Sequence, residues 1–415
     1  MLEFFYIILT FTMILLLLRK KVALGYSLLI GSAVLAALAR MNPIYFISTS
    51  YSALSEPTAL TLLATVVLLG ILGYVLRETG SLQRMVDSLQ GLFRSKRTIM
   101  GLIPGLIGLV SVPGAAVISA PMIDDLGDDL HYSAGKKAAI NMLFRHVWFP
   151  AYPMSTSLIS LAAIGGVSIY SLIKFNLPAS AVALIVAILL LLGRNHDQLG
   201  IVASSTSDIV ESAGSDFNGP SNFNIFMAST APIFISLILV LVLKWPYPVS
   251  LLFGIASALA INRITDWKMI GSYLVRGLDL KIGMAIVGVM VFKEVVQESG
   301  FVISIVSNLV TGGVPLSILI IVLPMFVALA TGSSMAAIAI ILPILLPLFP
   351  AAPASIPLLS MLFISSTFGY FFSPLHLCLI LTNEYFKTEY TEIYKYSVLP
   401  MLAMILTAFV IVFIF

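Results

Sequence analysis

One apolar stretch, residues 98–123, constrains the fold most, because a polar break interrupts it halfway. Ser111, Pro113 and Gly114 lie in this break. The apolar arm on each side is shorter than the ~20 residues of helix that cross a bilayer. We therefore predict a re-entrant hairpin that enters the membrane, turns at residues 111–114 and leaves on the same side. Irregular backbone at that depth is tolerated only where protein buries it or it lines a wet cavity, so the turn is a candidate site.

Composition indicates that the rest of the chain also lies in a membrane. Of its 415 residues 60% are hydrophobic and 10% are charged, and the mean hydropathy is +1.08, which is too apolar for a soluble domain. We predict an all-α polytopic protein of the cytoplasmic membrane. Its first apolar segment ends on Arg19 and not on a cleavage site, so we expect this segment to be retained. Apolar segments of helical length fall at residues 2–18, 22–39, 57–76, 168–192, 222–243, 247–261, 282–296 and 398–415.

The remaining segments occur in matching pairs, which indicates an internal duplication. A second hairpin, residues 315–350, turns at residues 331–334. Two broken helices, residues 135–165 and 354–385, are interrupted at 150–153 and 372–374, about 220 residues apart. Each half then holds three helices, a hairpin, a broken helix and a closing helix. Because a hairpin returns to its own side, each half crosses the membrane an odd number of times, and the second half is an inverted repeat of the first.

The positive charges predict the orientation in the membrane. Most Lys and Arg residues fall in connections that the crossing count places on one side, and this side is expected to be cytoplasmic. Both termini are then outside, and the two hairpins open from opposite sides. We divide the chain into scaffold helices with an arm (1–97 and 222–313), transport parts (98–192 and 314–415) and a cytoplasmic loop (193–221). The arms, residues 81–97 and 301–313, each precede a hairpin; ordinary surface helices are the alternative interpretation.

Hydroxyl groups and glycines at the two hairpin tips are the first candidate ligands. Ser111, Thr331 and Ser333 offer hydroxyl oxygens to a substrate or a coupling ion. Broken helices add backbone amides and carbonyls at the same depth. The substrate-binding candidates at the tips are Ser111, Pro113, Gly114, Thr331, Gly332, Ser333 and Ser334. The alternative interpretation is that proline and glycine bend the helices here, while serine and threonine cap them.

Arg145 is the strongest single candidate for substrate binding. Lys136 and Lys137 are expected at the cytoplasmic boundary, and the rise of a helix places Arg145 roughly 14 Å deeper, near the midplane. A guanidinium there is costly unless it is paired, and no acid occurs in the apolar part of its own hairpin or helix. We therefore expect an anionic ligand as its partner. A structural pair with backbone carbonyls or with the acidic patch at residues 124–129 is the alternative.

His146 and His376 are candidates for a proton relay, since each lies beside a break and histidine titrates near neutral pH. Asn141 and Asn383 on the broken helices are candidate ion ligands, and Tyr152 is a candidate substrate contact. Packing, capping and helix–helix hydrogen bonds are the alternatives for these five residues. Because the chain has one cysteine and scattered histidines, we expect no cysteine-built cluster, no metal, and no cofactor beyond a coupling Na⁺ or H⁺.

Two sequence motifs carry a resemblance to known membrane proteins. Ser-Val-Pro-Gly at 111–114 with Ser-Ala-Pro at 119–121, and Phe-Arg-His-Val-Trp at 144–148 followed by Tyr-Pro at 152–153, resemble an uncharacterised family of prokaryotic integral membrane proteins. The architecture as a whole resembles the ion-transporter superfamily of secondary carriers, which includes divalent-anion/sodium symporters and gluconate permeases. This resemblance implies an elevator mechanism with Na⁺ or H⁺ coupling, a homodimer, and the two arms as connectors.

The function that we predict is secondary active transport of a small anionic solute, such as a carboxylate, by symport or antiport. An intramembrane serine hydrolase is the alternative from another class. It is based on Gly332 and Ser333 with His376, but the second glycine of a Gly-x-Ser-Gly motif is missing. An anion channel is a further alternative, although hairpins on both sides favour alternating access. We thus expect no enzyme, a small anion and the lipid bilayer as partners, and no nucleic acid.

Overall fold

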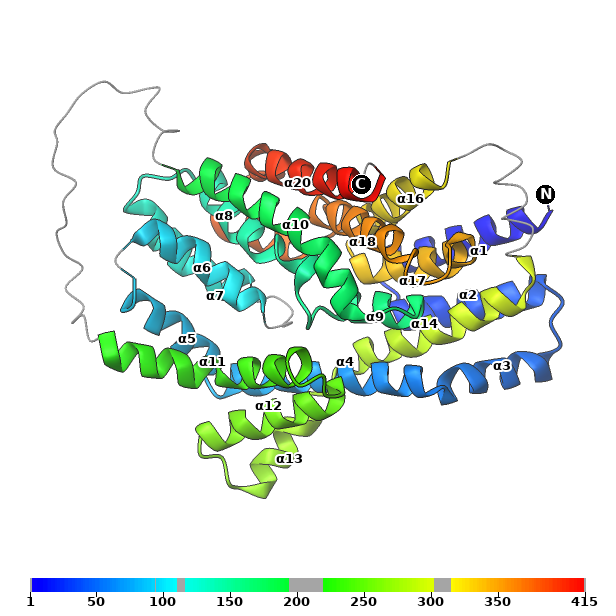
Figure 1. Ribbon diagram of the computed structural model, residues 1–415, viewed down its shortest axis with the longest axis horizontal. Coiled ribbons are helices and arrows are strands. Elements are labelled where there is room, and N and C mark those ends of the chain that lie inside the picture. Colours follow the sequence, from blue (N-terminus) through cyan, green and yellow to red (C-terminus); the bar gives the residue numbers. More distant parts are fainter. Residues whose placement is uncertain (1, 94, 110–115, 194–218, 302–314, 414–415) are drawn as a thin grey trace.

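The computed structural model describes residues 2–93, 95–109, 116–193, 219–301 and 315–413, and these parts consist of helices and short connections without a strand (Figure 1). Their outer faces expose large apolar side chains such as Leu189 and Leu406, which a bilayer covers. The chain is a multi-pass helical membrane protein, as its composition predicted. Within the described ranges, five segments are long and apolar enough to cross a membrane: Pro57–Glu78, Ala134–Gly165, Ile169–Leu192, Ser221–Leu241 and Tyr390–Phe413.

Two groups of helices build the molecule. The first group contains the leading helices of each half, and Figure 1 shows α4, α11 and α12 of this group along the lower side. Within the group, α2 packs on α14, and α12 packs on α4. Its members are α1 (Leu2–Arg19), α2 (Leu24–Leu38), α3 (Pro43–Ser55), α4 (Pro57–Glu78), α11 (Gly219–Leu241), α12 (Tyr247–Ile261), α13 (Trp267–Arg276) and α14 (Leu280–Glu298).

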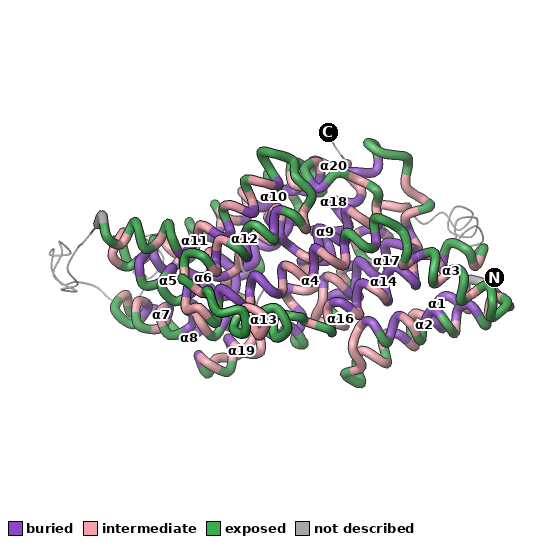
Figure 2. Tube along the Cα trace, turned by 90° about the horizontal axis from the view of Figure 1, so that it is seen from below, coloured by how far each residue is buried: buried purple, intermediate pink, exposed green. Residues whose placement is uncertain are grey.

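The second group contains the hairpin helices and the interrupted helices. In Figure 1, α6, α8, α10 and α20 of this group lie above α11 and α12. The groups meet where α9 packs on α4 and α17 packs on α14, in the buried middle of the molecule (Figure 2). Its members are α6 (Lys96–Gly108), α7 (Ala116–Asp128), α8 (Ala134–His146), η1 (Phe149–Ala151), α9 (Thr156–Gly165), α10 (Ile169–Ala187), η2 (Ile188–Leu192), α16 (Leu316–Thr331), α17 (Ser334–Leu345), η3 (Leu346–Leu348), α18 (Ile356–Phe371), α19 (Leu377–Phe386) and α20 (Tyr390–Phe413).

Helix α5 (Ser81–Gln90) connects the two groups. It packs on α4 and α11 of the first group and on α6 of the second. Arg84 Nη2 donates a hydrogen bond of 2.5 Å to Asn262 Oδ1 at the end of α12. One face of α5 is apolar and buried at helical spacing, through Leu82, Met85, Val86 and Leu89. The predicted arm at residues 81–97 therefore includes a short helix fixed to the first group. Residues 302–314 of the second arm lie outside the described residues.

The hairpin helices pack in pairs, α6 on α7 and α16 on α17. In Figure 1, α6 and α7 lie toward one end of the molecule, whereas α16 and α17 lie toward the other. α16 ends at Thr331 and α17 begins at Ser334, where the sequence predicted the turn of the second hairpin. The predicted turn of the first hairpin, with Ser111, Pro113 and Gly114, lies outside the described residues, so these candidates stay predictions.

Both broken helices are interrupted near the prolines that predicted the breaks. α8 ends at His146, a 3₁₀ turn follows, and α9 begins at Thr156. α18 ends at Phe371, and α19 begins at Leu377. Proline supplies no amide hydrogen and clashes with the preceding turn of a helix, so each interruption has a local cause in the sequence.

Side chains of neighbouring helices satisfy backbone carbonyls that the breaks free. Asn176 Nδ2 on α10 donates a hydrogen bond of 2.7 Å to the carbonyl oxygen of Pro150. Tyr394 on α20 donates through its hydroxyl, at 2.9 Å, to the carbonyl oxygen of Phe372. Irregular backbone inside a membrane protein persists only when such partners replace the helical ones. The closing helix of each half therefore stabilises the break of that half.

Helix order and helix ends recur about 220 residues apart. α4 begins at Pro57 and α14 at Leu280, while α10 begins at Ile169 and α20 at Tyr390. α2 of the first half packs on α14 of the second half, and in the same way α12 of the second half packs on α4 of the first. Such exchange is what a duplicated fold with a two-fold relation predicts. Left-handed residues also occur in corresponding pairs at helix ends: Lys21 and Lys244, Arg40 and Arg263, Gly80 and Gly300, and Gly166 and Lys387.

Some helical segments differ from the prediction. Four helices, and not three, precede the arm in each half, because α3 and α13 were missed. Neither belongs to the apolar helices of the described residues, so the two additional helices leave the expected number of membrane crossings unchanged. Each begins at a capping side chain: Asn42 Oδ1 accepts from Ile44 N and Asp266 Oδ1 accepts from Lys268 N, both at 2.9 Å. A search for apolar segments of membrane length does not detect such local signals. α11 begins at Gly219, so residues 219–221, which the prediction placed in the cytoplasmic loop, are helical.

Candidate functional site

The two helix breaks bring two buried histidines together. His146 ends α8, and His376 precedes α19; their ring centroids are 4.8 Å apart, with the rings nearly perpendicular at 88°. Each is 1% exposed. The ring of Tyr370 lies 3.8 Å from that of His376, and Cys378 completes the cluster. The sequence named the two histidines as separate candidates, whereas the structure places them in one buried polar cluster.

Arg145 lies beside this cluster and is 6% exposed. It immediately precedes His146 on α8, and it is close enough to Tyr370, His376 and Cys378 to interact with each electrostatically. Its Nη1 atom has no hydrogen-bond partner among the described residues. A buried guanidinium that is incompletely paired is unfavourable, because burial removes the water that would solvate its charge.

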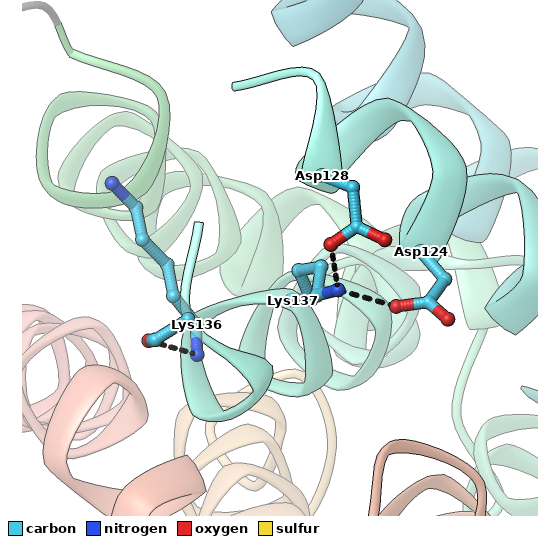
Figure 3. Close-up of polar contacts among 5 residues, drawn as sticks. Asp124, Asp128, Lys136 and Lys137 are labelled. Atoms are coloured by element: carbon cyan, nitrogen blue, oxygen red, sulfur yellow. Dashed lines mark hydrogen bonds and ion pairs between the residues drawn. The ribbon is translucent and has the colours of Figure 1, made fainter. Parts of the chain in front are cut away.

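The acidic patch that was the alternative partner of Arg145 is engaged elsewhere. Figure 3 shows Lys137 of α8 pointing toward Asp124 and Asp128 of α7. Lys137 Nζ lies 2.6 Å from Asp128 Oδ1 and also contacts Asp124 Oδ1. These ion pairs fasten the outer end of the first hairpin to the start of α8. None of the ion pairs that the described residues form includes Arg145.

Hydrogen bonds distinguish the two histidines of the cluster. His146 Nδ1 lies 2.7 Å from the carbonyl oxygen of Met142. Because a carbonyl oxygen only accepts, Nδ1 carries the proton, and Nε2 keeps a lone pair when the ring is neutral. Both ring nitrogens of His376 lack a hydrogen-bond partner in the described parts of the chain. Buried polar groups ordinarily have a partner, so the cluster has unused capacity to bind one.

The second hairpin tip rests on the second break. Gly332 has a φ of +67°, and a Cβ at this position would lie 2.7 Å from backbone atoms of Leu375. Glycine alone combines that backbone conformation with so close an approach. Ser373 Oγ adds a hydrogen bond of 2.6 Å to the carbonyl oxygen of Leu329 on α16. The tip therefore packs against Leu375, the residue that immediately precedes His376.

The three hydroxyl groups of this tip all bond within the protein. Thr331 donates to the carbonyl oxygen one turn earlier, at 2.7 Å. Ser333 Oγ caps α17 by accepting from Ala336 N at 3.1 Å, and Ser334 Oγ lies 2.8 Å from Ser366 Oγ of α18. Capping and helix–helix bonding, the alternative interpretation, thus occur here. A hydroxyl oxygen in such a bond keeps lone-pair capacity for a cation.

Tyr152 makes the corresponding contact in the first half. Its hydroxyl donates to the carbonyl oxygen of Leu109 at the end of α6, as Ser373 donates to Leu329 on α16. The side chain is buried between the first break and the first hairpin. Tyr152 therefore holds the hairpin against the broken helix, a role that its assignment as a substrate contact did not include.

Asn141 and Asn383 differ in how fully their amides are bonded. Asn141 Oδ1 accepts from Ser119 Oγ at 2.5 Å, and its Nδ2 donates to Ala116 O at 3.0 Å and Thr382 Oγ1 at 3.2 Å. It thereby joins α7, α8 and α19. Asn383 Oδ1 is buried and has no partner among the residues that the structure describes. Of the two, Asn383 keeps the free acceptor that a cation needs.

The sequence did not identify Tyr370 and Cys378 as members of the site. Tyr370 lies near the end of the apolar helix α18, and tyrosine in such a helix is ordinarily interpreted as packing. Cys378 follows His376 by two residues, just after a predicted break. That local spacing was the available signal, but the approach of both residues to His146 depends on how the two halves pack.

The interrupted helices and the buried cluster between them define a class, a multi-pass helical membrane protein with a polar centre at its helix breaks. Within that class, the chain belongs to the family described as "Protein of unknown function (DUF401)", whose family model matches residues 4–414. The match confirms the part of the resemblance that pointed to an uncharacterised family. A comparison with curated proteins gave no match.

Proposed function

We propose that the protein is a secondary active transporter of a small anionic solute, such as a carboxylate, in the cytoplasmic membrane. Arg145 carries the proposal, because its buried Nη1 lacks a partner among the described residues. His376, whose two ring nitrogens are also unpartnered there, belongs to the same cluster. A carboxylate or phosphate-like group accepts hydrogen bonds from such donors and neutralises the guanidinium charge.

The electrostatics of Arg145 favour a binding role over a structural one. An arginine at the centre of a membrane helix costs about 2.5–3.5 kcal/mol on insertion scales unless it is paired. Asp124 and Asp128 of the acidic patch bind Lys137 and not Arg145. An anionic solute at the breaks would supply the missing negative charge. The affinity of the site would then depend directly on the guanidinium.

Alternating access follows if the two halves are inverted-topology repeats. The recurrence of helix ends, the exchanged pairings of α2 and α12, and the opposite placement of the two hairpins support this proposal. We propose that the second helix group moves against the first as an elevator, with α5 as a connecting arm. The ion-transporter resemblance adds a homodimer formed by the first group. The distribution of positive charges adds, in this proposal, that both termini lie outside the cell.

The coupling ion is Na⁺ or H⁺ in this proposal. Sodium prefers oxygen ligands, and Asn383 Oδ1 together with the hydroxyls of Thr331 and Ser333 offers them. Protons would instead pass through His146 and His376, which lie in ring contact. The two alternatives predict different driving forces for transport: a sodium gradient in the first case and a pH gradient in the second.

The serine hydrolase alternative has less support. A nucleophilic serine needs a base within hydrogen-bonding reach. Ser333 Oγ caps α17, and none of the hydrogen bonds in the described parts of the chain joins it to His376. A channel is distinguished by function, because it dissipates a gradient, whereas a carrier uses one gradient to build another.

A thermal-shift panel tests the anion site. Purified protein in detergent is melted with succinate, citrate, gluconate, sulfate or phosphate, each as the sodium and as the choline salt. We expect at least one anion to raise the melting temperature. Arg145→Lys should weaken its binding about 10- to 100-fold, because an ammonium group cannot reproduce the planar fork of a guanidinium, and Arg145→Ala should remove the binding.

The matched control is Arg276→Lys, a change of an exposed arginine on α13. It should leave every anion response as in the wild-type protein. Two results would contradict the anion site: a panel in which no anion stabilises the protein, or an Arg145→Ala variant that folds and binds the anion with wild-type affinity.

A further inference from the structure

Three metal-ligating side chains meet at the two helix breaks. The donor atoms of His146, His376 and Cys378 all lie within 4.8 Å of one another. His146 belongs to α8 in the first half, whereas the other two residues lie at the start of α19 in the second half. We propose that this cluster binds a borderline or soft transition-metal ion, represented by Zn²⁺. The sequence predicted no metal, because the three residues are not close together along the chain.

Each of the three residues has a donor atom available. His146 Nδ1 donates to the Met142 carbonyl oxygen at 2.7 Å, which orients the ring and leaves Nε2 as the lone-pair atom. Metal-bound histidines commonly use this arrangement. His376 has two ring nitrogens without a partner among the described residues. Cys378 is a free cysteine, and the thiolate form of cysteine is the metal ligand.

The donor types decide the class of ion. Imidazole nitrogen and thiolate sulfur suit Zn²⁺ and related transition metals, whereas Ca²⁺ and Mg²⁺ require oxygen ligands. Zn–N bonds of about 2.0–2.1 Å and Zn–S bonds of about 2.3 Å place the donors of a tetrahedral site about 3.4–3.6 Å apart. The cluster, with its limit of 4.8 Å, must therefore contract by about 1 Å. Rotation of the His376 and Cys378 side chains can supply a change of this size.

Arg145 determines which fourth ligand fits. A Zn²⁺ ion with one thiolate keeps a net positive charge, and the Arg145 guanidinium, which interacts with Cys378, adds another. Three protein ligands leave one coordination position for an exogenous group, as in catalytic zinc sites. Two cationic groups at one place favour an anion in that position. The metal site stands on its own donor atoms, so it does not depend on the proposed transport activity.

Thiol labelling of the wild-type protein tests the site without a mutation. Cys378 is the single cysteine of the chain, so a thiol reagent reports on this position alone. Detergent-purified protein is stripped with a chelator and then reacted with a small methanethiosulfonate, with Zn²⁺ or with Mg²⁺ present. We expect Zn²⁺ to slow the labelling at least tenfold and Mg²⁺ to leave the rate unchanged. Equal rates with the two ions would overturn the proposal.

Cobalt provides a second, spectroscopic readout. Co²⁺ bound by a thiolate gives a sulfur-to-metal charge-transfer band, which we expect in the wild-type protein and not in Cys378→Ser. His376→Gln should weaken Co²⁺ binding at least tenfold. His131→Gln, a change of an exposed histidine outside the cluster, is the matched control. A wild-type protein without the band, or a band that survives in Cys378→Ser, contradicts the metal site.

The experiments can contradict the proposed metal site and the proposed anion site independently of each other. Arg145→Ala removes no metal ligand, so it should keep the Co²⁺ band while it loses stabilisation by the anion. Zn²⁺ protection of Cys378 in a protein that no anion stabilises would support the metal site and contradict the anion carrier. Anion binding without Zn²⁺ protection would do the reverse.

Discussion

Lys137 and Arg145 lie about two turns apart on α8, and their charges differ in whether they have a partner. Lys137 contacts two carboxylates, whereas Arg145 Nη1 has no partner among the described residues. Removing the partner of a buried charge destabilises the fold, and a buried charge that lacks a partner is a candidate for ligand binding. One helix thus carries a paired cation at its outer end and, at its inner end, the cation that we propose binds the anion.

Lys137→Met tests the structural role. The change keeps an apolar stem of similar length but leaves Asp124 and Asp128 without their shared cation. We expect the free energy of unfolding to fall by about 1–3 kcal/mol, less than for a fully buried pair because the Asp128 side chain is 70% exposed. Chemical unfolding in detergent measures this loss. Lys96→Met, which breaks an exposed pair with Asp129, is the control and should cost less than about 1 kcal/mol; equal losses would contradict the assignment.

At the scale of elements, each hairpin is fastened to the broken helix of its own half. Ser373 bonds the carbonyl of Leu329, and Tyr152 bonds the carbonyl of Leu109. The close approach of Gly332 to Leu375 adds a steric fit at the second tip. A hairpin and its broken helix therefore behave as one body in the proposed motion, because separating them would leave buried carbonyls without partners.

Gly332→Ala tests the seating of the second hairpin. Alanine must adopt a φ of +67°, and its Cβ must find room 2.7 Å from the backbone of Leu375. We expect a loss of about 2–4 kcal/mol in unfolding free energy, from backbone strain and overpacking together. Gly166→Ala is the control, since Gly166 has a φ of +62° but no atom within 4 Å of its added Cβ. It should lose only about 1–2 kcal/mol, and a loss as large as that of Gly332→Ala would contradict the tight seating.

The sequence predicted those elements whose cause is local. Length of the apolar run and prolines at 150–153 and 372–374 were enough to place the long helices and the interruptions near their observed ends. α3 and α13 were missed because capping residues such as Asn42 and Asp266, and not apolar length, define them. The cluster of His146, His376 and Cys378 was missed as a unit, because it forms through packing between distant helices.

At the scale of the whole molecule, exchanged helix pairings relate the two halves. α2 packs on α14 as α12 packs on α4, and the two hairpins lie toward opposite ends of the molecule (Figure 1). The outer faces of this arrangement are apolar, while Arg145 Nη1 and the two ring nitrogens of His376, which lack partners among the described residues, lie at the helix breaks inside. Such a distribution suits a carrier whose site is reached from either side in turn.

Cysteines at the outer ends of the two hairpins test the inversion. Asp125→Cys on α7 and Ala351→Cys after η3 change exposed positions and are introduced into a Cys378→Ala protein. An impermeant maleimide added to intact cells should label Ala351→Cys, because inverted repeats place it outside. Asp125→Cys should react only after the membrane is permeabilised. Labelling of both positions from the same side would refute the inverted topology.

Gradient-driven uptake into proteoliposomes tests the carrier proposal most directly. The radiolabelled form of the anion that stabilises the protein is supplied outside, and a Na⁺ gradient or an H⁺ gradient is imposed, directed inward to drive symport or outward to drive antiport. We expect accumulation above the external concentration under one of the two gradients, no accumulation without it, and none for Arg145→Ala. Entry that only equilibrates the anion, or that equals uptake by protein-free liposomes under both gradients, would contradict a secondary active transporter.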